Sequence, residues 1–335
     1  METKRIAVLF TGGTIGSSEQ EEHIAVGATA KKSLISHFEE HSPRAGEVTF
    51  TEYEPFRILS ENMTPDYWEQ LIAAVWSLDE HAFDGIIITH GTDTLGYTAA
   101  LLARVLDGLS IPTVLVSAGA VLTSPTSNGH ANFRDAVDLI CTYHGGGVFV
   151  PFRTVSGECQ IFRGEDLMQC SVYTDEFFSF NGKLAGTIEG GCFVGEEREN
   201  RPVQQSLIGR SISLRARVLC LQSYPGMDYH TVNLTDVDVV LHGLYHSSTA
   251  CTEAGRYSLN AFLLRCAEWH IPVYGAPCLR KPIERDYETT VTLKKSGMIL
   301  LRNCSWETAY AYVLLAHSLF ESTEDRMHFL QPYLS

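Results

Sequence analysis

The sequence has no long apolar run and no cysteine spacing of the kind that binds metal. No apolar stretch reaches the roughly 18 residues needed to span a bilayer, so we expect no membrane association. The first residues lead directly into a strand-like segment, without the apolar core and cleavage site of a secretory signal. The nine cysteines are scattered, without CxxC or Cys/His spacing. These features predict reduced thiols in a cytoplasmic protein that holds no metal ion.

Positive charge is also scarce. Lysine and arginine number 25 against 40 aspartates and glutamates, for a net charge of -15. Because an acidic surface repels phosphate backbones, we expect no nucleic-acid partner. Low-complexity segments and internal repeats are missing as well. The 335 residues, 44% of them hydrophobic, are enough to bury the cores of two domains.

Strand-like and helix-like segments alternate along the chain. Continuous apolar runs predict buried strands at residues 6–10, 85–89 and 111–117. Apolar residues at helical spacing predict helices at 65–77, 94–106 and 131–143. This alternation predicts an α/β fold with a mostly parallel sheet covered by helices on both faces. Ligands of such sheets bind at the carboxyl ends of the strands.

A second strand-helix series follows a charged, proline-containing stretch. We therefore predict an N-terminal domain over 1–195, a linker over 196–214 and a smaller C-terminal α/β domain over 215–335. In the C-terminal domain, strands are expected near 218–221, 237–241 and 271–274, and helices near 257–269 and 305–319. Ser305 is placed to cap the last of these helices.

Two motifs directly follow predicted strands. Residues 11–16 read Thr-Gly-Gly-Thr-Ile-Gly, a turn in which glycines let the backbone approach a ligand and the Thr14 hydroxyl stands just beyond them. It lacks the spacing of a dinucleotide-binding or P-loop motif, so a plain turn with a capping threonine is the alternative. Residues 90–94 read His-Gly-Thr-Asp-Thr, where Thr92 or Asp93 could instead only cap the following helix.

Together these motifs resemble the paired signature of the asparaginases. The stretch 60–65, Ser-Glu-Asn-Met-Thr-Pro, resembles a substrate-binding loop of the cytoplasmic type I branch. Further similar stretches are Gly119-Ala120 with Asn128-Gly129 and Asn132, then Ala276-Pro277-Cys278 and Trp306-Glu307-Thr308-Ala309. The similarity covers nearly the whole chain and is thin between about residues 155 and 260.

The resemblance implies hydrolysis of a side-chain amide without any cofactor. Thr14 would attack the amide carbon, Thr92 would be the second active-site threonine, and Asp93 would hold the substrate's α-amino group. The implied substrate-binding residues are Ser60, Glu61, Gly91 and Ala120, with Ser60 near the α-carboxylate. A homodimer or homotetramer is implied too.

Three positions depart from the family pattern. Gln169, or Met168 after a one-residue shift, stands where the family has a lysine beside the second threonine, and glutamine cannot exchange a proton. His23 stands where a tyrosine supports the nucleophile, either as a substitute base for Thr14 or as an exposed loop histidine. In the turn 242–249, two histidines near hydroxyls are either an acid/base set or polar loop residues.

Three functional hypotheses follow from this pattern. The first is an asparaginase-like amidohydrolase acting on L-asparagine or a related small amide. The second is a catalytically weak or inactive amino-acid binder or sensor on the same scaffold. The third is a hydrolase for a dedicated amide or ester other than asparagine.

Overall fold

The chain divides into two compact units, Met1–Ile212 and Ser213–Ser335. The computed structural model describes residues 3–13, 15, 17–19, 24–26, 29–174, 176–180, 182–196, 206–278 and 285–334, with the side chains of 17–19, 24–26 and 29–33 left out. The division falls within the segment 196–214, where the sequence predicts a linker. Residues 197–205 of that segment lie outside the described part.

The first unit is built on an eight-stranded sheet. Its strands in spatial order are β12 (Cys192–Gly195), β11 (Gly186–Glu189), β8 (Cys159–Arg163), β7 (Gly147–Arg153), β6 (Pro112–Val116), β5 (Gly85–Thr89), β1 (Lys4–Phe10) and β4 (Val48–Tyr53). The five strands from β7 to β4 are all parallel, and the remaining pairs are antiparallel. Two small hairpins accompany the sheet: β2 (Ser17–Glu19) with β3 (Ile24–Val26), and β9 (Leu167–Met168) with β10 (Phe178–Ser179).

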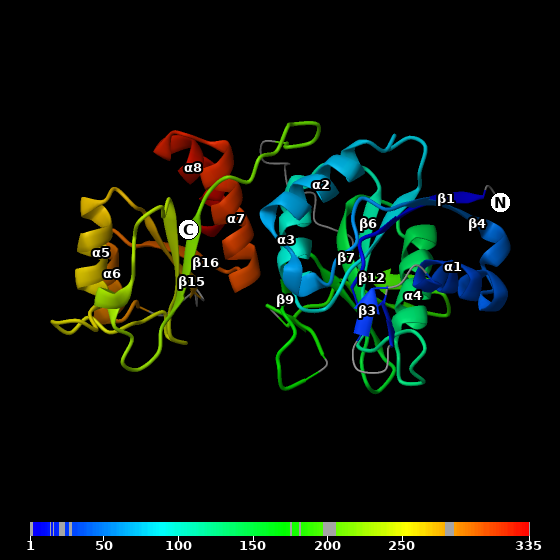
Figure 1. Cartoon of the computed structure of the whole chain (residues 1–335), viewed down its shortest axis with the longest axis horizontal. Coiled ribbons are helices and arrows are strands. Elements are labelled where there is room, and N and C mark those ends of the chain that lie inside the picture. Colours follow the sequence, from blue (N-terminus) through cyan, green and yellow to red (C-terminus); the bar gives the residue numbers. More distant parts are fainter. Residues whose placement is uncertain are drawn as a thin grey trace. The chain divides into compact units, whose positions relative to one another are not determined.

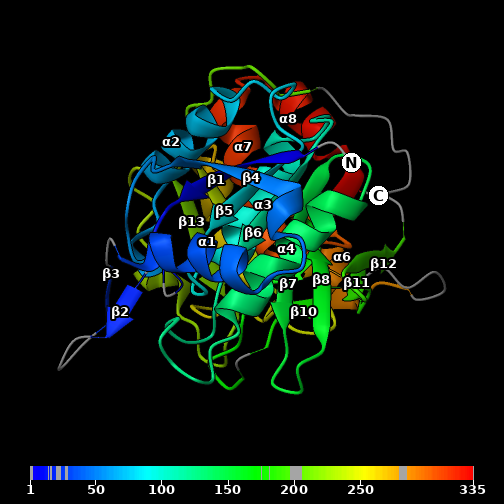
Figure 2. The same ribbon diagram turned by 90° about the vertical axis from the view of Figure 1, so that its right-hand side faces the viewer.

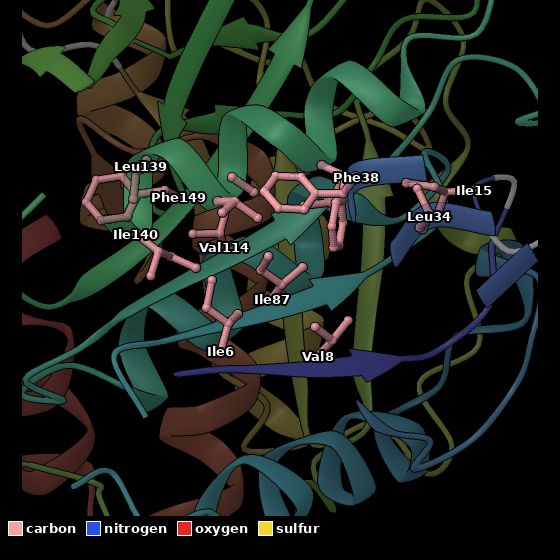
Figure 3. Packing of buried hydrophobic residues seen from close by; sticks show 14 of the residues in the cluster. Ile6, Val8, Ile15, Leu34, Phe38, Ile87, Val114, Leu139, Ile140 and Phe149 are labelled. Atoms are coloured by element: carbon pink, nitrogen blue, oxygen red, sulfur yellow. The ribbon is translucent and has the colours of Figure 1, made fainter. Parts of the chain in front are cut away.

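Helices cover both faces of this sheet, as the alternation predicts. Helices α1 (Thr29–His41) and α4 (Gly129–Thr142) lie on one face, and α2 (Pro65–Trp76) and α3 (Leu95–Val105) on the other (Figures 1 and 2). Alternate strand residues such as Ile6, Val8 and Ile87 point toward α1 and α4, where they pack with Phe38 and Ile140 (Figure 3). This packing fixes the strands whose carboxyl ends carry the two motifs.

The second unit repeats the same principle on a smaller scale. Four parallel strands run in the order β13 (Val218–Gln222), β14 (Val239–Gly243), β15 (Val273–Cys278) and β16 (Ile299–Arg302). Helices α5 (Leu259–Glu268) and α6 (Glu288–Lys295) lie on one side, and α7 (Trp306–Leu319) lies on the other (Figure 1). Residues of β14, β15, α5 and α6 share one buried cluster.

The main strands and helices predicted from the sequence are present, with boundaries shifted by a few residues. Ser305 caps α7 as expected, since its Oγ accepts a hydrogen bond from the Thr308 amide at 3.0 Å. That helix is not the last one, however, because α8 (Thr323–Leu330) follows it. Weakly patterned or short elements, such as α1, β4 and the antiparallel edge strands, were not predicted. No helix among the described residues is long and apolar enough to cross a membrane.

Candidate functional site

The motif-bearing loops leave neighbouring strands at one edge of the large sheet. Strands β4, β1, β5 and β6 are adjacent and parallel, so their carboxyl ends lie side by side. The loop after β1 carries the first motif, the loop after β5 the second, the loop after β4 carries Ser60, and the loop after β6 carries Ala120. The His90 amide donates to the Val116 carbonyl at 2.9 Å, which joins the start of the second motif to the end of β6.

The two motifs touch through their glycines. A Cβ placed on Gly13 would lie 2.2 Å from the Gly91 backbone nitrogen and 2.5 Å from its Cα. Gly13 also has a φ of 77°, which L side chains rarely adopt. Its amide donates to the Ile58 carbonyl at 2.9 Å, and the Ile58 amide donates to the Thr11 carbonyl at 3.0 Å. Only glycine therefore allows these loops to pack backbone to backbone.

Ser60 is the third element of this contact. Its side chain is buried, and its Oγ accepts a hydrogen bond from the Asp93 amide at 3.3 Å. The Thr94 hydroxyl donates to the Ser60 carbonyl at 2.9 Å. A Cβ on Gly91 would lie 2.3 Å from Ser60 Oγ. Ser60, Gly91, Thr92 and Asp93 are thus brought together, and η3 (Ser60–Asn62) also places Glu61 beside them with an exposed side chain.

Thr92 and Asp93 do not cap the helix that follows them. Helix α3 has Thr94 at its N-cap position, and no side-chain cap bond comes from that residue. Thr92 is half-buried and Asp93 is exposed. Among the described residues, neither the Thr92 hydroxyl nor the Asp93 carboxylate forms a hydrogen bond. Both groups are therefore available to a ligand, and the capping interpretation has no support.

Gln169 supplies the cap from a distant part of the chain. Its Oε1 accepts a hydrogen bond from the Gly96 amide at 3.0 Å, and its Nε2 donates to the Thr92 carbonyl. The side chain follows β9 and reaches the turn between β5 and α3, so it fixes the backbone of the second motif. Because both ends of the amide bind backbone, Gln169 holds Thr92 in place and has no proton to exchange with its hydroxyl.

His90 has a structural role beneath the second motif. Its side chain is buried, and burial lowers its pKa to about 4. Nδ1 lies 2.7 Å from the Gly91 carbonyl, which can only accept, so Nδ1 carries the proton. Nε2 then accepts from the Thr98 hydroxyl at 2.9 Å, and Thr98 Oγ1 accepts from Trp68 Nε1 at 2.9 Å. The neutral imidazole is fully bonded and fixes the turn.

The loop after β6 is held by two asparagines of α4 and its cap. Asn128 Oδ1 accepts from the Gly119 amide at 2.9 Å, and Asn132 Nδ2 donates to the Ser117 carbonyl at 2.8 Å. Half-buried Ala120 lies on this loop, and its carbonyl accepts from Ser127 Oγ at 2.8 Å. The sequence singled out the asparagines only as part of a similar stretch. Their i, i+4 spacing is the signal that could have indicated a clamp.

Two predicted catalytic residues, Thr14 and His23, lie outside the described residues. The neighbours of Thr14 are buried on both sides, Gly13 against Gly91 and Ile15 in the hydrophobic core. The choice between His23 as a base and as an exposed loop histidine stays open.

The turn 242–249 separates its two histidines. His242 is buried at the end of β14, where its Nε2 lies 2.9 Å from the Tyr229 hydroxyl, and burial lowers its pKa to about 4. His246 is exposed on the following turn. Among the residues that the structure describes, no group of three or more histidine, cysteine or acidic side chains is arranged to hold a metal ion.

The family model for the N-terminal domain of asparaginase matches residues 5–199. The chain belongs to the asparaginase family. It is 26% identical over 329 residues to a glutamyl-tRNA(Gln) amidotransferase subunit of Metallosphaera sedula, covering 93% of this chain and 72% of that protein. It is 33% identical over 204 residues to L-asparaginase 1 of Escherichia coli K12, covering 60% of this chain and 57% of that protein. The matched stretch thus spans little more than half of that asparaginase.

Solved asparaginases share the fold over nearly the whole chain. The thermostable L-asparaginase from Thermococcus kodakarensis superposes with a TM-score of 0.79 at 21% identity, covering 97% of this chain and 96% of that one. L-asparaginase I from Vibrio cholerae gives a TM-score of 0.78 at 24% identity, covering 99% and 98%. These likenesses show that the chain has the asparaginase fold, with the large and small α/β units described above.

Proposed function

We propose that this chain hydrolyses the side-chain amide of L-asparagine or a related small amide to the acid and ammonia. The observation that supports the proposal is the backbone contact between Gly13 and Gly91, because it joins the two motifs at the carboxyl ends of β1 and β5, and a threonine follows each glycine in the sequence. Thr14 would be the nucleophile. Asp93, whose carboxylate is exposed and has no described partner, would bind the α-amino group.

In this proposal the protein's own groups carry each step. The Thr14 hydroxyl attacks the amide carbon, backbone amides of the glycine turns stabilise the oxyanion, and ammonia leaves. Water then releases the acyl group. Thr92 would pass protons at this site, and His23 would act as the base for Thr14. The substrate would also contact Ser60, Glu61, Gly91 and Ala120.

Ammonia release from asparagine, glutamine and a panel of longer amides tests the proposal. The panel is broad because the relatives include both an L-asparaginase 1 and a component of an amidotransferase. Thr14→Ala should abolish release, and Asp93→Asn should raise KM more than it lowers kcat. The matched control is Thr51→Ala, which removes an exposed hydroxyl from β4, outside the loops of the site. Full activity in Thr14→Ala would refute the assigned nucleophile.

A binder or sensor is the second candidate, and the geometry of Gln169 favours it. Its amide is engaged by the Thr92 carbonyl and the Gly96 amide, so the residue at the family's lysine position exchanges no proton with the Thr92 hydroxyl. Loss of an acid/base partner costs ~10²–10⁴ in rate. This candidate predicts calorimetric binding of L-aspartate, lost in Asp93→Ala, with no turnover of any amide. A turnover number in the ordinary range for enzymes would eliminate it.

Gln169→Lys separates the two candidates further. A lysine cannot accept from the Gly96 amide, so the variant loses the cap of α3 while gaining a proton-exchanging group. An increase in kcat would show that the other catalytic groups are in place and that the parent protein lacks only the lysine. We also predict a homodimer or homotetramer in the cytoplasm, which sedimentation velocity and cell fractionation would test.

A further inference from the structure

A hollow lies in the C-terminal unit, at the amino ends of its strands and so at the opposite end of the sheet from the turn 242–249. It has a volume of about 460 Å³ and is lined by residues just before β14 and β15 together with parts of α7 and α8. Among its lining residues are Arg215, Arg326, Asp238, Trp269 and His270. None of these belongs to the asparaginase motifs.

The two arginines are oriented but not neutralised. Arg326 donates from Nε to the Phe320 carbonyl at 2.8 Å, and Arg215 donates from Nε to Ser213 Oγ at 2.9 Å. Among the described residues, neither guanidinium forms an ion pair, and the Nη groups of both make no hydrogen bond. Each arginine is thus held through Nε, and its two Nη groups can still form a bidentate contact with a carboxylate or phosphate.

The acidic residue of the hollow does not cancel this charge. Asp238 accepts from Arg217 Nη2 at 2.8 Å and from Arg217 Nε at 3.1 Å. Arg217 also pairs with Asp236, so the three residues together carry one negative charge. His317 is neutral, because burial and the Arg326 guanidinium lower its pKa to about 4. The charges of Arg215 and Arg326 therefore exceed the one negative charge left on this cluster, in a chain whose net charge is -15.

Another hollow shows that this arrangement is not general. It lies in the first unit and is lined by three arginines, yet two of them are matched by buried carboxylates. Arg153 Nε lies 2.7 Å from Asp135, and Arg44 Nε lies 2.9 Å from Asp138. Those charges are used inside the fold, whereas the Nη groups of Arg215 and Arg326 have no partner in the described part of the chain.

The rim offers a flat apolar surface next to the arginines. Trp269 is 57% exposed, which is unusual for an indole. The adjacent His270 has a φ of 57°, a left-handed conformation that costs a non-glycine residue about 1 kcal/mol. A glycine would relieve this strain, but it would not place a side chain in the hollow.

We propose that this hollow is a binding site for a small organic oxyanion, a carboxylate or phosphate attached to a flat group. The guanidinium forks of Arg215 and Arg326 bind the oxyanion, and the flat group stacks on Trp269. The site is independent of amide hydrolysis at the large sheet. Its ligand class is defined by this chemistry, because charge-assisted bonds to arginine favour planar or tetrahedral oxyanions.

Calorimetry on the full chain at low ionic strength tests the site with three probes: inorganic phosphate, succinate and phenyl phosphate. Phenyl phosphate should bind more tightly than phosphate, and succinate reports whether carboxylates are accepted. Arg326→Gln and Arg215→Gln should each weaken binding about tenfold to hundredfold. Trp269→Leu should abolish only the advantage of phenyl phosphate.

Lys295→Gln is the matched control, because it removes one positive charge from α6 of the same unit, outside the hollow. It should leave all three affinities within about twofold. Circular dichroism checks that each variant is folded, and Arg326→Lys should retain part of the affinity. The proposal is overturned if none of the probes binds at about 10 mM, or if the double arginine variant binds like the parent.

Discussion

Each of the two sheets holds a buried histidine at the carboxyl end of a parallel strand, and the two strand ends, called here the first and the second edge, bond this histidine differently. His90 follows β5 and uses both ring nitrogens, one on the Gly91 carbonyl and one on Thr98. His242 ends β14 and uses Nε2 on Tyr229, while its buried Nδ1 makes no hydrogen bond of normal geometry among the described residues and has only a weaker interaction with the Gly243 backbone. Burial lowers the pKa of both to about 4.

The difference shows what makes the first edge a rigid support for chemistry. Both ring nitrogens of His90 and the Thr98 hydroxyl are hydrogen-bonded, and the glycines of the two motifs pack without intervening side chains. Around His242 one ring nitrogen remains unpaired among the described residues, which is uncommon for a buried polar group. We therefore expect that removing a hydrogen bond to His90 lowers the free energy of unfolding more than removing one to His242.

Gly13→Ala should have the largest effect. The new Cβ would lie 2.2 Å from the Gly91 nitrogen, and the backbone stays at a φ of 77°. We expect the free energy of unfolding to fall by about 5 kcal/mol and amide hydrolysis to be lost. Urea unfolding measures the change.

Two controls separate the causes of that effect. Gly226 has a φ of 86°, and a Cβ placed on it would meet no described atom within 4 Å. Gly226→Ala therefore isolates the cost of backbone strain, about 1 kcal/mol. Gly46→Ala meets nothing within 4 Å and should change stability by less than about 0.5 kcal/mol. A Gly13→Ala protein as stable as Gly226→Ala would mean that the two motifs do not touch.

Thr98→Val should have the second largest effect. The substitution keeps the shape of the side chain but removes the hydroxyl between Trp68 and His90, leaving His90 Nε2 buried without a donor. We expect a loss of about 3 kcal/mol in urea unfolding, together with reduced kcat because the second motif is loosened. Thr98→Ser, which retains the hydroxyl, should keep most of the stability and activity.

Features of the first edge that depend on contacts between residues close in sequence could be predicted from the sequence, and those that depend on distant contacts could not. Strand β5, helix α3 and the turn between them follow from apolar periodicity and glycine within one short stretch. The network of His90 was not predictable, because Thr98 and Trp68 come from two helices whose packing no local pattern specifies. Gln169 was found by resemblance, but its bonds to Thr92 and Gly96 depend on how β9 returns to the sheet.

Mild acid should weaken both edges, which tests what they share. The folded-state pKa of each histidine is about 4, below the unfolded value of about 6.5, so the unfolded chain takes up protons first. Stability is full above about pH 6.5 and declines as the pH falls toward 4. At pH 5 we expect a loss of about 2 kcal/mol from each histidine.

His242→Gln should remove the His242 share of this decline. Urea unfolding of the parent and the variant at pH 7.5, 6.5 and 5 (test conditions spanning the unfolded value) gives the comparison. Parallel pH profiles for the two proteins would mean that His242 is not held neutral. The neutral form matters to the comparison, because only a neutral ring can leave Nδ1 unpaired at modest cost.

Tyr229→Phe should have the smallest effect, since it disturbs an edge that already tolerates an unmatched nitrogen. The variant removes the hydroxyl 2.9 Å from His242 Nε2 and preserves the stacking of the ring on Phe262. We expect a loss of about 1 kcal/mol in urea unfolding, smaller than that for Thr98→Val. Equal losses in the two variants would show that the two edges are alike. A smaller loss in Tyr229→Phe would mean that the hydrogen bond to His242 contributes less to stability than the bond to His90. The hydrogen bonds of His90, which lie beneath Thr92 and Asp93, would then support the site as well as the fold.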